Sequence, residues 1–157
     1  MKKMFFLTVL FFTIFSLSAQ SVAVRAIDMV LTLLENAVPE MFTLSEPNIY
    51  VSPDRSITVL TDGEVIKTVL VTWFFEYRPG AETYLRNFQE SLNAIPGVKA
   101  AVIVPSFFSD NNYIYLSREV YVIMYPPMLV MRNSSTAYRV NILFTKDFHW
   151  YFDWLFK

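Results

Sequence analysis

Three side chains close together in the sequence, Asp147, His149 and Asp153, are of types that bind a metal ion or relay a proton. Two carboxylates and one imidazole form a ligand set that zinc accepts. On a helix, His149 and Asp153 would share a face without Asp147, whereas on a strand all three would share one face. The same residues could serve a hydrolase-like enzyme, in which His149 acts with Asp147 or Asp153. No motif around them supports either chemistry, so we expect no metal or other cofactor and favour a non-enzymatic protein.

The same segment is rich in aromatic residues, among them Trp150, Tyr151, Phe152 and Trp154. The alternation of aromatic and polar residues fits one long strand. A strand that ends near Thr145 fits as well, if a short helix follows with Thr145 or Asp147 as its N-cap, and we favour this helix. Its rings could cover the core, bind a protein partner or an apolar small ligand, or contact a membrane. We take these four aromatic residues as the candidate binding residues.

Charged residues gather at two other places in the sequence. Glu76, Arg78 and Glu82 surround a predicted turn, where paired carboxylates beside an arginine could do acid–base chemistry. An exposed ion pair on a solvated turn explains them more simply, and we adopt that interpretation. Arg132 and Arg139 flank the last predicted hairpin loop, and we expect them at its rim or across the strands from each other.

The composition excludes several classes of site. The chain has 157 residues, one histidine, three glycines and no cysteine. Without cysteine there are no disulfides, no thiolate metal sites and no lipid anchor, so the protein is not expected to be a lipoprotein. The three isolated glycines form no phosphate-binding loop and no nucleophile elbow. The formal net charge is −1 and no lysine or arginine cluster is present, which argues against a nucleic-acid partner.

The N-terminal segment has the three-part pattern of a secretory signal peptide. Two lysines form a short positive region, an apolar run follows over residues 4–17, and small residues end at Ala19. The run is shorter than the ~20 apolar residues of a membrane span. We expect cleavage after Ala19, so that residues 1–19 are the signal peptide and residues 20–157 a single domain. Cleavage changes the net charge from −1 to −3, because it takes away both lysines and no acidic residue. No later stretch has the length and composition of a transmembrane helix, so we expect none in the mature chain.

Two amphipathic helices are predicted within the domain. Apolar residues at helical spacing indicate the first over residues 21–38 and the second over residues 81–95. Pro39 should end the first helix, and Arg78-Pro79-Gly80 should separate the second helix from the strand before it. Both helices are interpreted as packing on the core of the domain.

The other apolar runs predict strands. Asp62-Gly63 between two β-rich runs is a strong hairpin signal. The run over residues 64–77 is apolar on both faces, which is typical of a central strand covered on both sides. Residues 107–112, which contain Asp110-Asn111-Asn112, predict a turn, and residues 128–132 and 138–145 predict a further hairpin. We therefore expect an α+β fold, an antiparallel sheet of about five to seven strands with two or three helices packed on one face.

These observations predict an exported protein that is periplasmic or extracellular. We expect a non-enzymatic module of the cell envelope, or a secreted one, that binds a protein partner or an apolar small ligand through aromatic surface. A membrane-associated envelope component and the hydrolase-like enzyme around His149 are the two alternatives.

Overall fold

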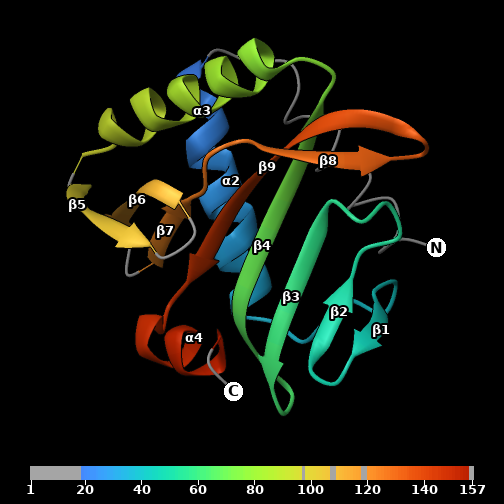
Figure 1. Ribbon diagram of the computed structural model, residues 1–157. Helices are drawn as coiled ribbons and strands as arrows, with labels where there is room; N and C mark the ends of the chain where they lie inside the picture. The colour runs from blue at the N-terminus through green and yellow to red at the C-terminus, as the bar shows by residue number, and fades with distance from the viewer. Residues whose placement is uncertain (1–18, 97, 107–108, 118–119, 156–157) are drawn as a thin grey trace.

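The computed structural model describes residues 19–96, 98–106, 109–117 and 120–155 (Figure 1). These residues form three helices and nine strands. The helices are α2 (Ala19–Leu34), α3 (Arg78–Asn93) and α4 (Phe148–Leu155). The strands are β1 (Thr43–Glu46), β2 (Ile49–Val51), β3 (Ile57–Asp62), β4 (Val65–Phe75), β5 (Lys99–Ser106), β6 (Ser109–Ser117), β7 (Val120–Met124), β8 (Met128–Arg132) and β9 (Ser135–Thr145). All nine strands join one antiparallel sheet, which confirms the α+β fold class.

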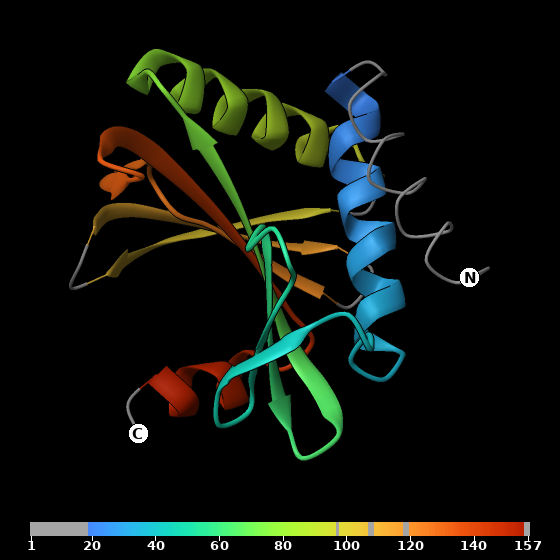
Figure 2. The ribbon, with the colours of Figure 1, turned by 90° about the vertical axis from the view of Figure 1, so that its right-hand side faces the viewer.

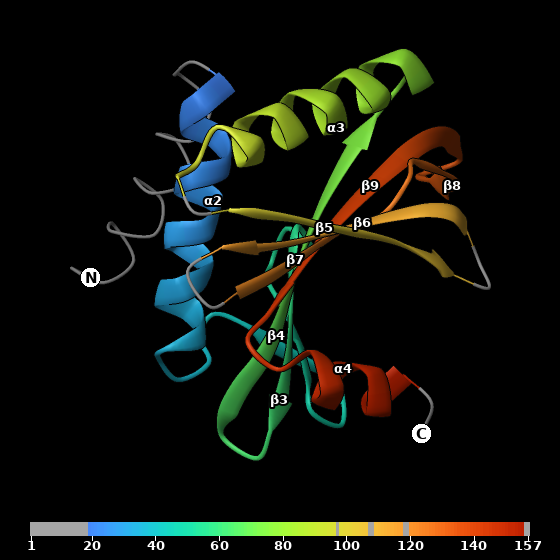
Figure 3. The same ribbon diagram turned by 90° about the vertical axis from the view of Figure 1, so that its left-hand side faces the viewer.

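Strands β4 and β9 lie at the centre of the sheet. The strand order is β1-β2-β3-β4-β9-β7-β6-β5, and β8 pairs with β9 as well. One edge of β9 pairs with β4. Its other edge pairs with β8 along the first half of β9 and with β7 along the second half. Figure 3 shows β5, β6 and β7 crossing β3 and β4 at a steep angle, as strong sheet twist produces. The strand count exceeds our expectation of five to seven, because the connector over residues 39–55 contains both β1 and β2.

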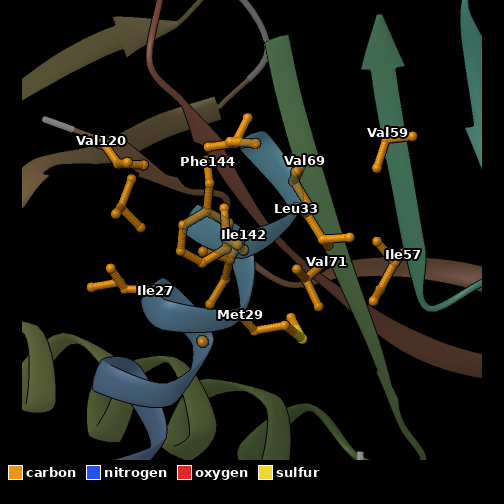
Figure 4. Packing of buried hydrophobic residues seen from close by; sticks show 14 of the residues in the cluster. Ile27, Met29, Leu33, Ile57, Val59, Val69, Val71, Val120, Ile142 and Phe144 are labelled. Atoms are coloured by element: carbon orange, nitrogen blue, oxygen red, sulfur yellow. The ribbon is translucent and has the colours of Figure 1, made fainter. Parts of the chain in front are cut away.

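Helices α2 and α3 pack on one face of the sheet and enclose the main core with it (Figure 2). Side chains of α2 converge on those of the central strands (Figure 4). The cluster includes Ile27, Met29 and Leu33 of α2, Val69 and Val71 of β4, and Ile142 and Phe144 of β9. Met29 and Leu33 are buried together with Ile27 and Val30, so the buried face of this helix is wide. Removal of this apolar surface from water is the main contribution to folding.

Helix α4 lies on the opposite face of the sheet, which corrects the expectation that the helices pack on one face. Figure 2 shows the sheet between α4 and α2. There α4 covers a second, smaller cluster, in which its Tyr151 packs with Leu60, Ile123 and Leu143. The arrangement follows from the central strands, because their apolar residues point alternately to both sides and the two longer helices cover one side.

The hairpin predicted at Asp62-Gly63 is confirmed, with β3 and β4 on its two sides. The turn glycine has a φ of +61°, a conformation that favours glycine. Next to the turn, the pairs Leu60–Thr68 and Thr61–Ile66 leave one extra residue in β4. This bulge reverses the side of the sheet to which the side chains of β4 point before it. Ile66 therefore joins the main core rather than the face of the sheet that α4 covers, which we call the second face.

Both long helices are shifted toward the N-terminus relative to the prediction. The first ends at Leu34 instead of residue 38. Just after this end, the side-chain amide of Asn36 donates a hydrogen bond to the carbonyl of Thr32 in the last turn. The second begins at Arg78, because Pro79 fits into the first turn, where a missing N–H breaks no helical hydrogen bond. The predicted strand break is therefore the start of the helix.

The turn predicted over residues 107–112 is wrong from residue 109 onward, because Asp110-Asn111-Asn112 belong to β6. Residues 107 and 108 lie outside the described residues. Asn112 pairs with Val104 of β5, and the next residue pairs with Met124 of β7. Pairing with β5 outweighs the weak local preference of aspartate and asparagine for turns.

Candidate functional site

The C-terminal segment is a strand followed by a short helix, which confirms the interpretation that we favoured. Asp147 is the N-cap of α4, because its Oδ1 accepts a hydrogen bond of 2.9 Å from the backbone N–H of Trp150. The Oγ1 of Thr145 accepts a hydrogen bond from the N–H of Asp147 at 3.2 Å and lies 3.2 Å from the Oγ1 of Thr68. These contacts fix the start of α4 to the ends of β4 and β9.

The candidate aromatic residues of α4 pack on the second face of the sheet. Tyr151 is 7% exposed and belongs to the second cluster. Trp150 and Trp154 are half-buried against the same cluster, and the rings of Tyr151 and Trp154 stack with their centroids 6.4 Å apart. The side chain of Phe152 lies outside the described residues. Helix α4 therefore covers this face, with the outer parts of two tryptophans left at the surface.

A hydrogen bond joins α4 to the residue that follows β7. The hydroxyl groups of Tyr125 and Tyr151 lie 3.1 Å apart. Burial raises the pKa of both hydroxyls, and for Tyr151 the neighbouring Tyr125 raises the pKa further. Both groups consequently stay protonated at neutral pH, where they fix the position of α4 and supply no base.

Of the three candidates for metal binding or proton relay, Asp147 caps α4, and His149 and Asp153 lie on the helix itself. Asp147 is occupied as the helix cap, and His149 and Asp153 are exposed. The His149 ring packs edge-on against Phe148, with 6.4 Å between the centroids. Within the described ranges, no group of three or more histidine, aspartate or glutamate side chains could hold a metal ion. The structure thus gives Asp147 a structural role.

The charged residues at the start of α3 form an exposed ion pair, as we expected. Arg78 Nε lies 2.7 Å from Glu82 Oε1, one helical turn further along, and Glu76 is exposed. Exposed pairs of this kind contribute little to stability and hold no reacting group in place.

A concavity of about 260 Å³ lies between α3 and the segment that joins β7 to β8. It is lined by Glu82, Leu85, Arg86, Gln89, Met124 and Tyr125, together with two prolines. Sites for drug-sized ligands usually enclose about 300–1,000 Å³ and bring several polar groups to one point. This concavity is smaller, and its polar residues belong to the surface of α3, so it does not indicate a particular ligand.

Apolar side chains are exposed along β8, which we had predicted as half of an ordinary hairpin. Leu129 is 61% exposed, Met131 is 71% exposed, and Met128 is exposed as well. Pro126 and Pro127 precede this strand, and without N–H groups they cannot continue the ladder between β6 and β7. Within the part of the chain that the structure describes, β8 therefore pairs with β9 alone, and its outer edge is unpaired. Figure 1 shows the β8–β9 hairpin extending away from β5, β6 and β7.

Two arginines of the same hairpin flank Phe74 of β4. Arg139 stands directly opposite Phe74 in the pairing of β4 with β9, so the two side chains share a face. The Cζ atom of Arg132 lies 4.1 Å from the centroid of the Phe74 ring, which is a cation–π contact. The sequence predicted these arginines at the rim of a loop, but it did not indicate that Phe74 lies beside them. Only the pairing of β4 with β9 brings Phe74 next to this hairpin.

The chain matches no protein-family model, no curated protein and no solved structure. Among the described residues, no helix has the length and the apolar character needed to cross a membrane. Its function has to be inferred from its own geometry.

Proposed function

We propose that the protein is an exported, non-enzymatic binding module that pairs with an extended segment of a partner protein along the outer edge of β8. The observation that carries this proposal is an apolar, exposed strand with no neighbour at that edge among the described residues. An unpaired edge presents a row of N–H and C=O groups to which another strand can be added. The added strand would cover Leu129 and Met131.

A comparison with β1, the first strand in the order of the sheet, supports this choice. Strand β1 has four residues, carries Glu46 and is followed by Pro47. Short length, charge and proline are devices by which proteins protect their sheet edges from pairing. Strand β8 has no acidic residue or lysine, and its one charged residue, Arg132, is stacked on Phe74. Strand β8 is also short, with five residues, and two prolines precede it, so the difference from β1 lies in the charge: no carboxylate or lysine of β8 opposes an added strand.

The charges near β8 indicate what kind of segment would fit. Neither Arg132 nor Arg139 forms an ion pair with a described residue. A strand in which apolar and acidic residues alternate would place apolar side chains on Leu129 and Met131 and carboxylates near the two guanidinium groups. Such complementarity of charge favours the correct partner over neutral or basic strands.

Leu129→Glu tests this surface. Wild-type protein is expected to bind a seven-residue peptide that alternates valine with glutamate, in a fluorescence-polarisation titration. The variant loses an apolar contact and repels the peptide, so its Kd should be about tenfold higher, or ~1.4 kcal/mol. The matched control is Leu44→Glu, because Leu44 is also 61% exposed and lies on β1. The proposal fails if no such peptide binds, or if both variants weaken binding equally.

Export is the second part of the proposal, and the N-terminal sequence pattern supports it. Among the described side chains of α2, those in the main core begin at Ala26, so cleavage after Ala19 would leave them in place. When the full chain is produced in a secreting bacterial host, the intact mass of the exported protein should lack residues 1–19. Ala19→Arg removes the small residue that cleavage requires and should retain them. Recovery of the uncut wild-type chain from the cytosol would contradict export.

A further inference from the structure

Arg139 has a buried donor group without an acceptor in the part of the chain that the structure describes. Its Nε is buried and has no hydrogen-bond partner among the described residues, and its Nη2 makes a weak contact, 3.9 Å from Met128 Sδ. Buried donors are nearly always paired in folded proteins. An acceptor from outside the chain would therefore stabilise this side chain.

Arg132 brings a second guanidinium group to the same ring. Its Cζ lies 4.1 Å from the centroid of Phe74, and Phe74 is the cross-strand partner of Arg139. Directly opposite residues have Cβ atoms about 4.5–5.5 Å apart, so both arginines are neighbours of one aromatic ring. Stacking on the ring holds the Arg132 guanidinium in place before any ligand arrives.

The surroundings of these arginines combine positive charge with apolar surface. No described carboxylate forms an ion pair with either arginine, while Phe74 and Met128 supply apolar contacts. We propose that Phe74, Arg132 and Arg139 form a binding site for a small carboxylate with an apolar body. The two carboxylate oxygens accept hydrogen bonds from Nε–H and the adjacent Nη–H of Arg139, which match them in geometry. The charge of Arg132 supports the same group, and the apolar body lies beside Phe74 and Met128.

A ligand would approach this site from the second face of the sheet, and a side chain next to Arg139 has to move before the buried Nε becomes accessible. The cluster under α4 does not include Phe74, and Figure 1 shows α4 and β8 near opposite ends of β9. Arg132 and Met128 are exposed and Phe74 is half-buried. The thioether of Met128 is flexible enough to exchange its weak contact with Arg139 for the stronger bond of a carboxylate.

The Nε–Hε signal of Arg139 in a 15N-labelled protein reports directly on this site. Benzoate is the probe, and benzamide has the same shape without the charge. We expect benzoate to shift the Arg139 signal in a saturable way and benzamide to leave it in place. Arg132→Gln should weaken benzoate binding about fivefold or more, because it removes one of the two charges. Arg132 is exposed, so this variant is expected to fold normally.

Arg86→Gln is the matched control, since Arg86 is an exposed arginine of α3 without a hydrogen bond or ion pair to a described residue. Its benzoate affinity should equal that of the wild type. The site is refuted if benzoate produces no shift, if benzamide produces the same shift, or if Arg132→Gln binds as well as the wild type. Benzoate does not require the edge of β8, so this result and the peptide result of Leu129→Glu can fail independently.

Discussion

A chain that ends at Lys146 is expected to lose most of its stability, because α4 covers the second face of the sheet. The helix buries Tyr151 and partly buries Phe148, Trp150 and Trp154 against that face. Burial of one large apolar side chain contributes ~1.5–3 kcal/mol, so the loss should be roughly 5 kcal/mol, a large part of the about 5–15 kcal/mol of an ordinary domain. Urea unfolding followed by circular dichroism should show a much lower midpoint or no cooperative transition.

Point variants of α4 show whether the cover itself matters. Tyr151→Ala removes a buried ring and the hydrogen bond to Tyr125, and should lower the free energy of unfolding by about 3 kcal/mol. Asp153→Ala, on the exposed side of the same helix, should change it by about 0.5 kcal/mol at most. If the shortened chain unfolded at the wild-type urea concentration, α4 would not belong to the core. Trp150 and Trp154 would then be free for the binding role that the sequence suggested.

Phe144→Ala is expected to be the most damaging single substitution in the main core. Phe144 is 0% exposed and lies on β9, where side chains of α2 and β4 surround it (Figure 4). Truncation of a buried phenylalanine usually costs ~3–5 kcal/mol, since the packed surroundings close the resulting cavity only in part. The free energy of unfolding in urea measures this loss.

Two milder variants establish that the loss comes from the cavity. Phe144→Leu keeps most of the volume and should cost about 1–1.5 kcal/mol. Met131→Ala removes an exposed side chain from β8 and should change stability by about 0.5 kcal/mol at most. Equal losses for alanine and leucine at position 144 would contradict a tightly packed core around β9.

Local signals in the sequence determined most of the secondary structure. Asp62-Gly63 marked its hairpin, although Asp62 ends β3 and the two turn residues are Gly63 and Glu64. The first turn position has a positive φ, which favours glycine. The residues around Thr145 and Asp147 marked the end of β9 and the cap of α4 for the same kind of reason. The double apolar face of β4 also indicated that both sides of the sheet are covered.

The candidate site was predicted less well, and the reason is physical. The aromatic residues of α4 were visible in the sequence, but their burial depends on Leu60, Ile123 and Leu143, which come from three different strands. A composition rich in aromatic residues is compatible with a core and with a binding surface, and only the packing distinguishes the two.

Tertiary structure alone decided where the free surfaces of this protein lie. Pro126-Pro127 indicates in the sequence that the chain is interrupted between β7 and β8. The outer edge of β8 is unpaired because β6, which pairs with β7, does not pair with β8. Phe74 meets Arg132 and Arg139 because β4 and β9 pair in one particular register, and the sequence of neither strand encodes that register by itself. Helices and turns arise from residues a few positions apart, whereas sheet edges and their side-chain groups arise from contacts between distant segments.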